Sequence, residues 1–176
     1  MLETEINPND LKWHSEIEAA QIVSNPNVIN WNDEADLVVI GLGGAGIAAA
    51  NEALDQGYSV IGIDKTSGGG ATARSGGIFY AGGGTPIQKE AGVEDSVENM
   101  FNYLIQETGD IVKDSTLKKF CETSAENTQW LMDNGVQFNS QYYQTKTSYP
   151  GAGYFLYHSD NSLVPSYMEK ASPAPR

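Results

Sequence analysis

Two short apolar runs, separated by a stretch of small residues, form the clearest pattern in the chain. The runs Asp36–Ile40 and Ser59–Ile63 are rich in β-branched residues, which is typical of buried strands. Between them, Ile47–Gln56 has the composition of a helix, and Gly57 is placed to end it. The order strand, helix, strand predicts two adjacent parallel strands joined by a helical crossover.

A longer helix is predicted in the second half of the chain. Apolar residues recur with helical spacing over Val97–Ile105, and Gly109 is placed to stop this helix. The run Asp95–Glu98 has the form of a capping box in which Asp95 would be the N-cap. We therefore expect the helix to begin directly after Asp95.

The rest of the chain gives weaker patterns. A further helix is predicted for Ser115–Asn134, with Cys121 on its less polar face as a core residue. Residues 11–23 have the spacing of one short amphipathic helix. Between residues 141 and 157, aromatic residues alternate with Gly and Pro, and the sequence predicts no regular element there.

A glycine motif lies between the first predicted strand and the helix. Gly41, Gly43 and Gly46 match GxGxxG in the required context of a strand before and a helix after. The first glycine permits a sharp turn, the second a close approach to a diphosphate, and the third tight packing of helix on strand. The free N–H groups of the helix N-terminus favour an anion. The motif predicts a dinucleotide site, and the alternative is a structural unit whose glycines serve only turn and packing.

Two further features concern which dinucleotide would bind. Asp64 follows the second strand, and an acid there accepts hydrogen bonds from ribose hydroxyls and disfavours a 2′-phosphate. A second glycine-rich run, residues 68–77, comes soon after and exposes N–H groups to an extended ligand. This run favours FAD over NAD, although a flexible surface loop is an alternative reading of it.

Composition and charge exclude several classes of function. The chain has 10 Lys and Arg against 23 Asp and Glu, a formal net charge of −13, which disfavours nucleic acid and anionic membranes as partners. We find neither an apolar run long enough for a transmembrane helix nor the features of a signal peptide. With a single cysteine and no metal-ligand spacing, we expect no metal site and a cytoplasmic location.

Several stretches resemble one flavoprotein family. DLVVIGLGGAGIAAANEALDQGYSVIGIDK and GGGATARSGGIFYAGGGTP look like the amino-terminal part of the fumarate reductase and 3-oxosteroid dehydrogenase flavoproteins. ENTQWLMDNGVQF and the terminal ASPAPR are similar to the 3-oxosteroid dehydrogenase branch. The resemblance covers roughly Trp31–Arg176. It implies a Rossmann-like α/β fold, non-covalently bound FAD, and hydride transfer between the flavin and a carbon adjacent to an activated carbonyl, as in a 3-oxosteroid or an unsaturated acid such as fumarate.

The resemblance also implies a set of cofactor-binding residues. The first glycine motif would hold the diphosphate, and Asp64 would hold the adenosine ribose, where many relatives have Glu. The remaining positions would line the rest of the FAD path. The full set is Gly41, Gly43, Gly44, Ala45, Gly46, Asp64, Lys65, Ala71, Thr72, Ser75, Gly76 and Gly77. Catalytic residues of the family come later in the chain, so none is assigned here.

The family comparison leads to an expectation about domain organisation. Members are several hundred residues long, so we expect residues 1–34 to be an acidic leader and residues 35–176 to be the amino-terminal portion of an FAD-binding domain. The substrate domain and the second FAD region would be absent, and this chain alone would be inactive. We expect His158 and its neighbouring tyrosines to be packing residues. The alternatives are a non-enzymatic dinucleotide-binding module and an NAD-dependent dehydrogenase.

Overall fold

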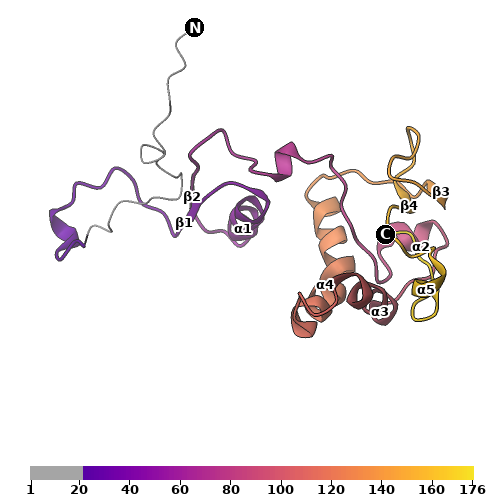
Figure 1. Ribbon diagram of the computed structural model, residues 1–176. Helices are drawn as coiled ribbons and strands as arrows, with labels where there is room; N and C mark the ends of the chain where they lie inside the picture. Colours follow the sequence, from indigo (N-terminus) through magenta and orange to yellow (C-terminus); the bar gives the residue numbers. More distant parts are fainter. Residues whose placement is uncertain (1–21) are drawn as a thin grey trace, which may run out of the picture. The chain divides into compact units, whose positions relative to one another are not determined.

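The chain forms two compact units that divide after Gly76. The computed structural model describes residues 22–176 (Figure 1). We call the part that ends at Gly76 unit 1 and the part from Gly77 to Arg176 unit 2. The helix predicted for residues 11–23 falls almost entirely outside the described residues.

Unit 1 contains the predicted strand–helix–strand arrangement. Its elements are β1 (Leu37–Ile40), α1 (Gly44–Asp55) and β2 (Val60–Ile63), preceded by the short 3-10 helix η2 (Pro26–Val28). β1 and β2 pair in parallel, with Val38 opposite Ile61, and α1 lies beside both strands (Figure 1). The predicted parallel pairing and helical connection are confirmed.

The element boundaries differ slightly from the prediction for a local reason. Each strand starts one residue late, because Asp36 and Ser59 bond to each other at the entrance of the sheet. The Ser59 N–H and hydroxyl both donate to Asp36 Oδ2, at 2.9 and 2.6 Å. α1 begins at Gly44 and not at Ile47, because the last part of the glycine motif forms its first turn. These bonds fix the register at which the two strands pair.

Unit 2 is built mainly from helices. Its elements are α2 (Pro86–Glu90), α3 (Val97–Thr108), α4 (Asp114–Asp133), β3 (Tyr142–Lys146), β4 (Leu156–His158) and α5 (Pro165–Met168). α3 and α4 pack side by side (Figure 1). Met100, Tyr103, Leu117 and Cys121 are buried between and around them, so the expected core position of Cys121 is confirmed.

Two features of unit 2 differ from the prediction. The N-cap of α3 is Ser96, whose side chain accepts the Asn99 N–H at 3.0 Å, so the prediction that Asp95 caps this helix was wrong. Asp95 is instead engaged by other partners, which include Arg176. The aromatic segment, for which no element was predicted, contains β3 and β4, and these strands pair in parallel.

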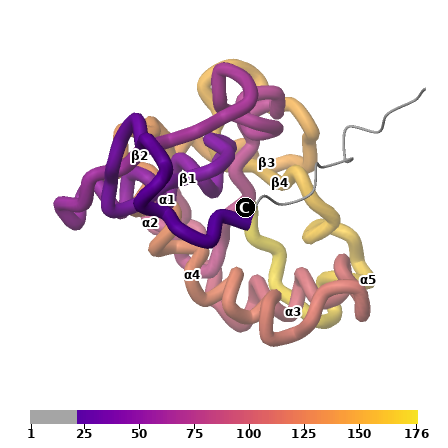
Figure 2. The backbone as a smooth tube through the Cα atoms, turned by 90° about the vertical axis from the view of Figure 1, so that its left-hand side faces the viewer, coloured from indigo at the N-terminus to yellow at the C-terminus, as the bar shows by residue number. Residues whose placement is uncertain are grey.

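The C-terminal segment of unit 2 is part of its core. Residues 171–176 lead away from α3 to the C-terminus (Figure 2), and the Ser172 N–H donates to Asn99 Oδ1 at 2.7 Å. The Arg176 side chain is fully buried and forms two hydrogen bonds with the equally buried Asp95 carboxylate, at 2.8 and 2.9 Å. Its guanidinium also lies over the Tyr103 ring, 5.3 Å from the centroid. The last residue of the chain therefore anchors this segment.

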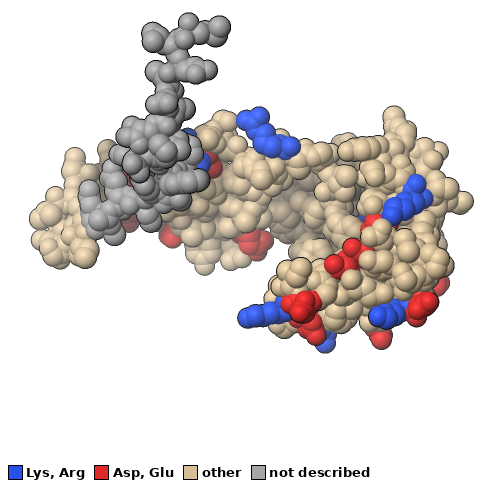
Figure 3. Space-filling model, in the orientation of Figure 1, with Lys and Arg blue, Asp and Glu red and all other residues tan. Residues whose placement is uncertain are grey.

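Charged side chains at the surface of unit 2 are exposed to water, unlike the buried pair of Arg176 and Asp95. On the face that Figure 3 shows, acidic and basic side chains are interspersed. Lys118 and Glu122 form an ion pair at 4.0 Å with both side chains largely exposed. Such pairs contribute little to stability because water screens them.

Candidate nucleotide-binding site

The glycine turn between β1 and α1 is held in one conformation by close packing. Gly41 has a φ of +93°, which only glycine adopts without strain. A Cβ on Gly46 would overlap the Gly41 carbonyl oxygen. The Gly41 N–H donates to the Ile63 carbonyl at 2.7 Å, which joins the turn to the end of β2. Gly41 and Gly46 therefore have the turn and packing functions that the motif predicts.

The N-terminus of α1 presents backbone donors and no side-chain cap. Gly43 is the N-cap and forms no side-chain hydrogen bond, and the Ile47 N–H donates to the Gly43 carbonyl at 2.9 Å. The first amides of a helix have no intrahelical acceptor. Those of Gly44, Ala45 and Gly46 are therefore oriented for an anion, and the helix dipole adds a partial positive charge there.

Asp64 connects the end of β2 to the glycine turn. Its Oδ2 accepts the Leu42 N–H at 2.7 Å, and its Oδ1 accepts both the N–H and the hydroxyl of Thr66 at 2.8 Å. These hydrogen bonds, with that from Leu42 the strongest cause, hold the pKa of the Asp64 carboxyl below its usual range. The charged form is thus the one that the loop stabilises.

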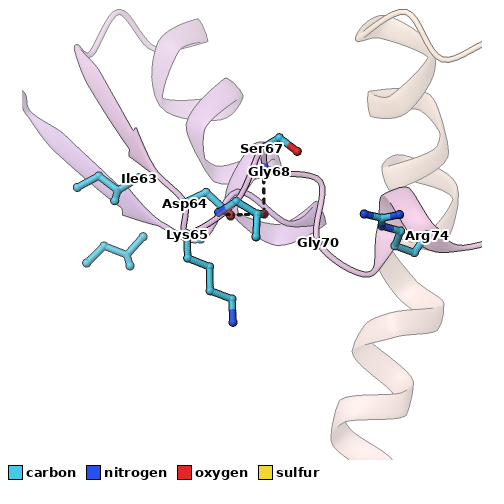
Figure 4. Close-up of a pocket in the computed structure, with 10 residues that line it drawn as sticks. Ile63, Asp64, Lys65, Ser67, Gly68, Gly70 and Arg74 are labelled. Carbon is cyan, nitrogen blue, oxygen red and sulfur yellow. Dashed lines mark hydrogen bonds between the residues drawn. The ribbon is translucent and has the colours of Figure 1, made fainter. Parts of the chain in front are cut away.

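A pocket of about 640 Å³ opens beside this carboxylate (Figure 4). It is lined by Ile40, Gly41, Ile63, Asp64, Lys65, Thr66, Ser67, Gly68, Gly70 and Arg74. Figure 4 shows the Lys65 side chain extending away from the Ser67–Gly68 loop, whereas Arg74 projects from a short helix at the far end. The pocket therefore combines one carboxylate, two cations and glycine backbone, a combination that suits a ribose and a phosphate group.

The second glycine-rich run folds back onto the first turn. The Gly69 N–H donates to the Leu42 carbonyl at 2.6 Å. A Cβ on Gly44 would lie 2.9 Å from Thr72 Oγ1. Ala71 is the cap of the 3-10 helix η3 (Thr72–Arg74). Unit 1 thus brings Ala71 and Thr72 to the N-terminus of α1.

The last three predicted residues lie outside the pocket lining. The Ser75 hydroxyl donates to the Thr72 carbonyl at 2.8 Å. Gly76 is the last residue of unit 1, and Gly77, with a φ of +78°, is the first residue of unit 2. The pocket itself gathers Gly41, Asp64 and Lys65 from the predicted set.

Sequence reasoning missed three polar residues of the pocket, Thr66, Ser67 and Arg74. Thr66 could have been found, because Thr two residues after Asp is able to close a turn onto the carboxylate. Arg74 could also have been found, since it is the one cation within the glycine-rich run of residues 68–77. The Arg74 guanidinium is a group that a nucleotide phosphate can use directly.

His158, the other candidate side chain, lies in unit 2 and outside the pocket. His158 is buried, with Nε2 2.9 Å from the Tyr142 hydroxyl and Nδ1 3.0 Å from Ser162 Oγ, and burial lowers its pKa.

Among residues 22–176, no three His, Cys, Asp or Glu side chains are grouped to hold a metal ion. In the same part of the chain, every helix is too short or too polar to cross a membrane.

Comparisons with known proteins place this geometry in context. Residues 36–157 match the protein family described as FAD binding domain. The chain is 42% identical over 145 residues to 3-oxo-5-alpha-steroid 4-dehydrogenase of Comamonas testosteroni, which covers 82% of this chain and 27% of that protein. It is 35% identical over 123 residues to the acrylate reductase flavoprotein subunit of Shewanella woodyi, which covers 69% of this chain and 24% of that subunit.

A solved structure gives the same result at the level of fold. The 3-ketosteroid-delta4-(5alpha)-dehydrogenase of Rhodococcus jostii RHA1, crystallised with 4-androstene-3,17-dione, superposes with a TM-score of 0.77 at 41% identity. The superposition covers 85% of this chain and 31% of that enzyme. The chain therefore spans about a quarter to a third of the length of these relatives.

Proposed function

This chain belongs to the FAD-binding domain family, and on that premise we propose that unit 1 binds the ADP half of FAD at the pocket beside Asp64 and the N-terminus of α1. The resemblance to the fumarate reductase and 3-oxosteroid dehydrogenase flavoproteins is confirmed, as are the Rossmann-like α/β fold and FAD as the cofactor. The matched family is described as an FAD binding domain, and this description favours FAD binding over the alternative of an NAD-dependent dehydrogenase.

The glycine turn is the observation that carries this proposal. Gly46 packs so closely on the Gly41 carbonyl that no side chain fits, and the first amides of α1 remain without a side-chain cap. A diphosphate is the group that such a helix end accepts. We assign the diphosphate to the amides of Gly44, Ala45 and Gly46, with Gly43 giving close access.

The remaining residues are assigned by their place around the pocket. Asp64 would accept a hydrogen bond from the adenosine ribose, and Lys65 and Arg74 would offset the charge of the diphosphate. Five residues of the second run would continue the path toward the flavin. These are Ala71, Thr72, Ser75, Gly76 and Gly77.

The proposed reaction belongs to the oxidoreductases that act on a CH–CH bond. Bound FAD supplies hydride transfer to or from a carbon adjacent to an activated carbonyl. The substrate class is a small molecule, a 3-oxosteroid or an unsaturated acid, because the relatives named above act on such compounds. The residues of this chain hold the cofactor, and no acid or base of the reaction is assigned to them. We also propose that the protein acts in the cytoplasm.

The test is a titration of FAD into the chain and its variants. Asp64→Ala should weaken FAD binding by about 10- to 150-fold, the usual worth of a hydrogen bond to a charged group. Asp64→Glu should cost much less. Asp55→Ala is the matched control, since this exposed carboxylate at the end of α1 lies outside the pocket.

Melting temperatures separate binding from folding in this experiment. Removing Asp64 also removes its bonds to Leu42 and Thr66, so Asp64→Ala should lower the melting temperature of the free chain. Equal FAD dissociation constants for all four proteins would exclude Asp64 from the site. NAD binding as tightly as FAD would exclude the proposed cofactor preference.

A further inference from the structure

Thr66 occupies two acceptor positions of the Asp64 carboxylate. A carboxylate oxygen accepts about two hydrogen bonds. Asp64 Oδ1 already accepts two, from the N–H and the hydroxyl of Thr66, both at 2.8 Å. Oδ2 accepts one, from the Leu42 N–H at 2.7 Å. Within residues 22–176, a single acceptor position is therefore open, and it lies on Oδ2.

The orientation of the Thr66 hydroxyl is fixed from both sides. The Gly68 N–H donates to Thr66 Oγ1 at 3.3 Å, so this oxygen serves as an acceptor on one side. Its own proton is then directed to Asp64 Oδ1, and the dashed lines of Figure 4 mark this chain of bonds. Thr66 thus links the carboxylate to the second glycine-rich run.

From this arrangement we infer that Thr66 is a specificity-determining residue, which limits Asp64 to one of the two adenosine ribose hydroxyls. The inference rests on the proposed ADP site and deepens it. A ribose presents two neighbouring hydroxyls, and a carboxylate with two open positions could accept from both. With Oδ1 saturated by Thr66, one hydroxyl bonds to Oδ2 and the other remains outside the reach of Asp64.

The experiment compares ADP with 2′-deoxy-ADP and 3′-deoxy-ADP, titrated into the wild-type chain and two variants. In the wild type, one deoxy analogue should bind about 10- to 150-fold more weakly than ADP, and the other should bind about as well. Thr66→Val removes the hydroxyl at constant shape and opens a position on Oδ1, so both analogues should then bind more weakly than ADP. Thr66→Ser retains the hydroxyl and should behave as the wild type.

A second measurement does not require a ligand. The Thr66 hydroxyl stabilises the charged carboxylate, so an NMR titration of the free chain should give a higher pKa for Asp64 in Thr66→Val and an unaltered pKa in Thr66→Ser. An unaltered pKa in Thr66→Val would show that the hydroxyl does not hold Oδ1, which overturns the inference.

The binding outcomes separate this inference from the proposed function. A wild type that binds ADP and loses affinity for both deoxy analogues overturns the inference alone. The same holds if Thr66→Val keeps the wild-type pattern. A wild type that does not bind ADP overturns the inference together with the proposed site.

Discussion

Unit 1 and unit 2 use their polar groups in opposite ways. In unit 1 the Asp64 carboxylate lies at the rim of a pocket, and its partners are the Leu42 N–H and Thr66. In unit 2 the corresponding carboxylate, Asp95, is buried and bonds to Arg176, 81 residues away. One unit leaves polar groups open to a ligand, and the other uses them to hold its own chain together.

Apolar residues follow the same division. Val39 is buried in the described part of unit 1, while Ile40 is 84% exposed and Val38 48% exposed. Unit 2 buries Met100 and Cys121 completely. Burial of apolar surface is the main stabilising contribution in folding, so we expect unit 2 to be the more stable of the two. The difference indicates that a glycine turn can be specified by local geometry with little core of its own.

The largest expected effect concerns the buried ion pair of unit 2. Arg176→Leu leaves the Asp95 carboxylate without its charge partner in the core, and breaking such a pair costs about 3–5 kcal/mol. Hydrogen exchange of the α3 amides should report this loss as reduced protection. The control is Lys118→Met in the exposed pair with Glu122, which should change stability by less than about 1 kcal/mol. Equal effects of the two substitutions would contradict the contrast between buried and exposed charge.

The next effect concerns the glycine turn of unit 1. Gly46→Ala forces a Cβ against the Gly41 carbonyl, and overpacking of this kind costs about 1–3 kcal/mol. Protection of the α1 amides should fall, and FAD binding should weaken because the turn has moved. Gly151→Ala serves as the control, since this glycine lies outside the proposed site and an added Cβ there would meet only Tyr154 Cδ2, at an ordinary contact distance of 4.0 Å. A Gly46→Ala chain as stable as the wild type would show that the turn is not closely packed.

A moderate effect is expected at the start of α3. Ser96 accepts the Asn99 N–H, and loss of an N-cap side chain costs about 1 kcal/mol. Ser96→Ala should therefore lower the denaturation midpoint of unit 2 by a small but measurable amount. Unit 1 should be unaffected, because its helix α1 has no side-chain cap to lose.

The smallest effect is a pH dependence. Burial lowers the pKa of His158 in the folded chain, so the unfolded chain binds a proton first as the pH falls below the usual value of 6.5. Unit 2 should consequently lose stability between pH 7 and the lowered folded pKa. Denaturation midpoints measured across this range should decline in the wild type and remain level in His158→Gln. A wild type with no decline would contradict the lowered pKa.

Part of this protein could be predicted because it depends on neighbours in the sequence. The parallel pair β1–β2, the connecting helix and the turn at Gly41 follow from a local strand pattern and from steric properties of glycine. The capping box of α2, Thr85 with Gln88, was equally readable from the sequence but was missed. In the turn and the cap, the residues that interact are close along the chain, so local rules apply. The β1–β2 pair joins residues farther apart, such as Val38 and Ile61, and could be predicted because the order strand, helix, strand favours a parallel crossover.

The sequence by itself therefore determined the glycine turn and the strands beside it, whereas the tertiary structure decided which of several polar residues meet. Both Asp95 and Ser96 can cap a helix, and Ser96 caps α3 while Asp95 bonds to Arg176. The aromatic segment formed β3 and β4 because each strand found the other as partner, 14 residues apart at Tyr142 and Leu156. Such choices depend on which distant groups reach the same place in space, and no local propensity contains that information.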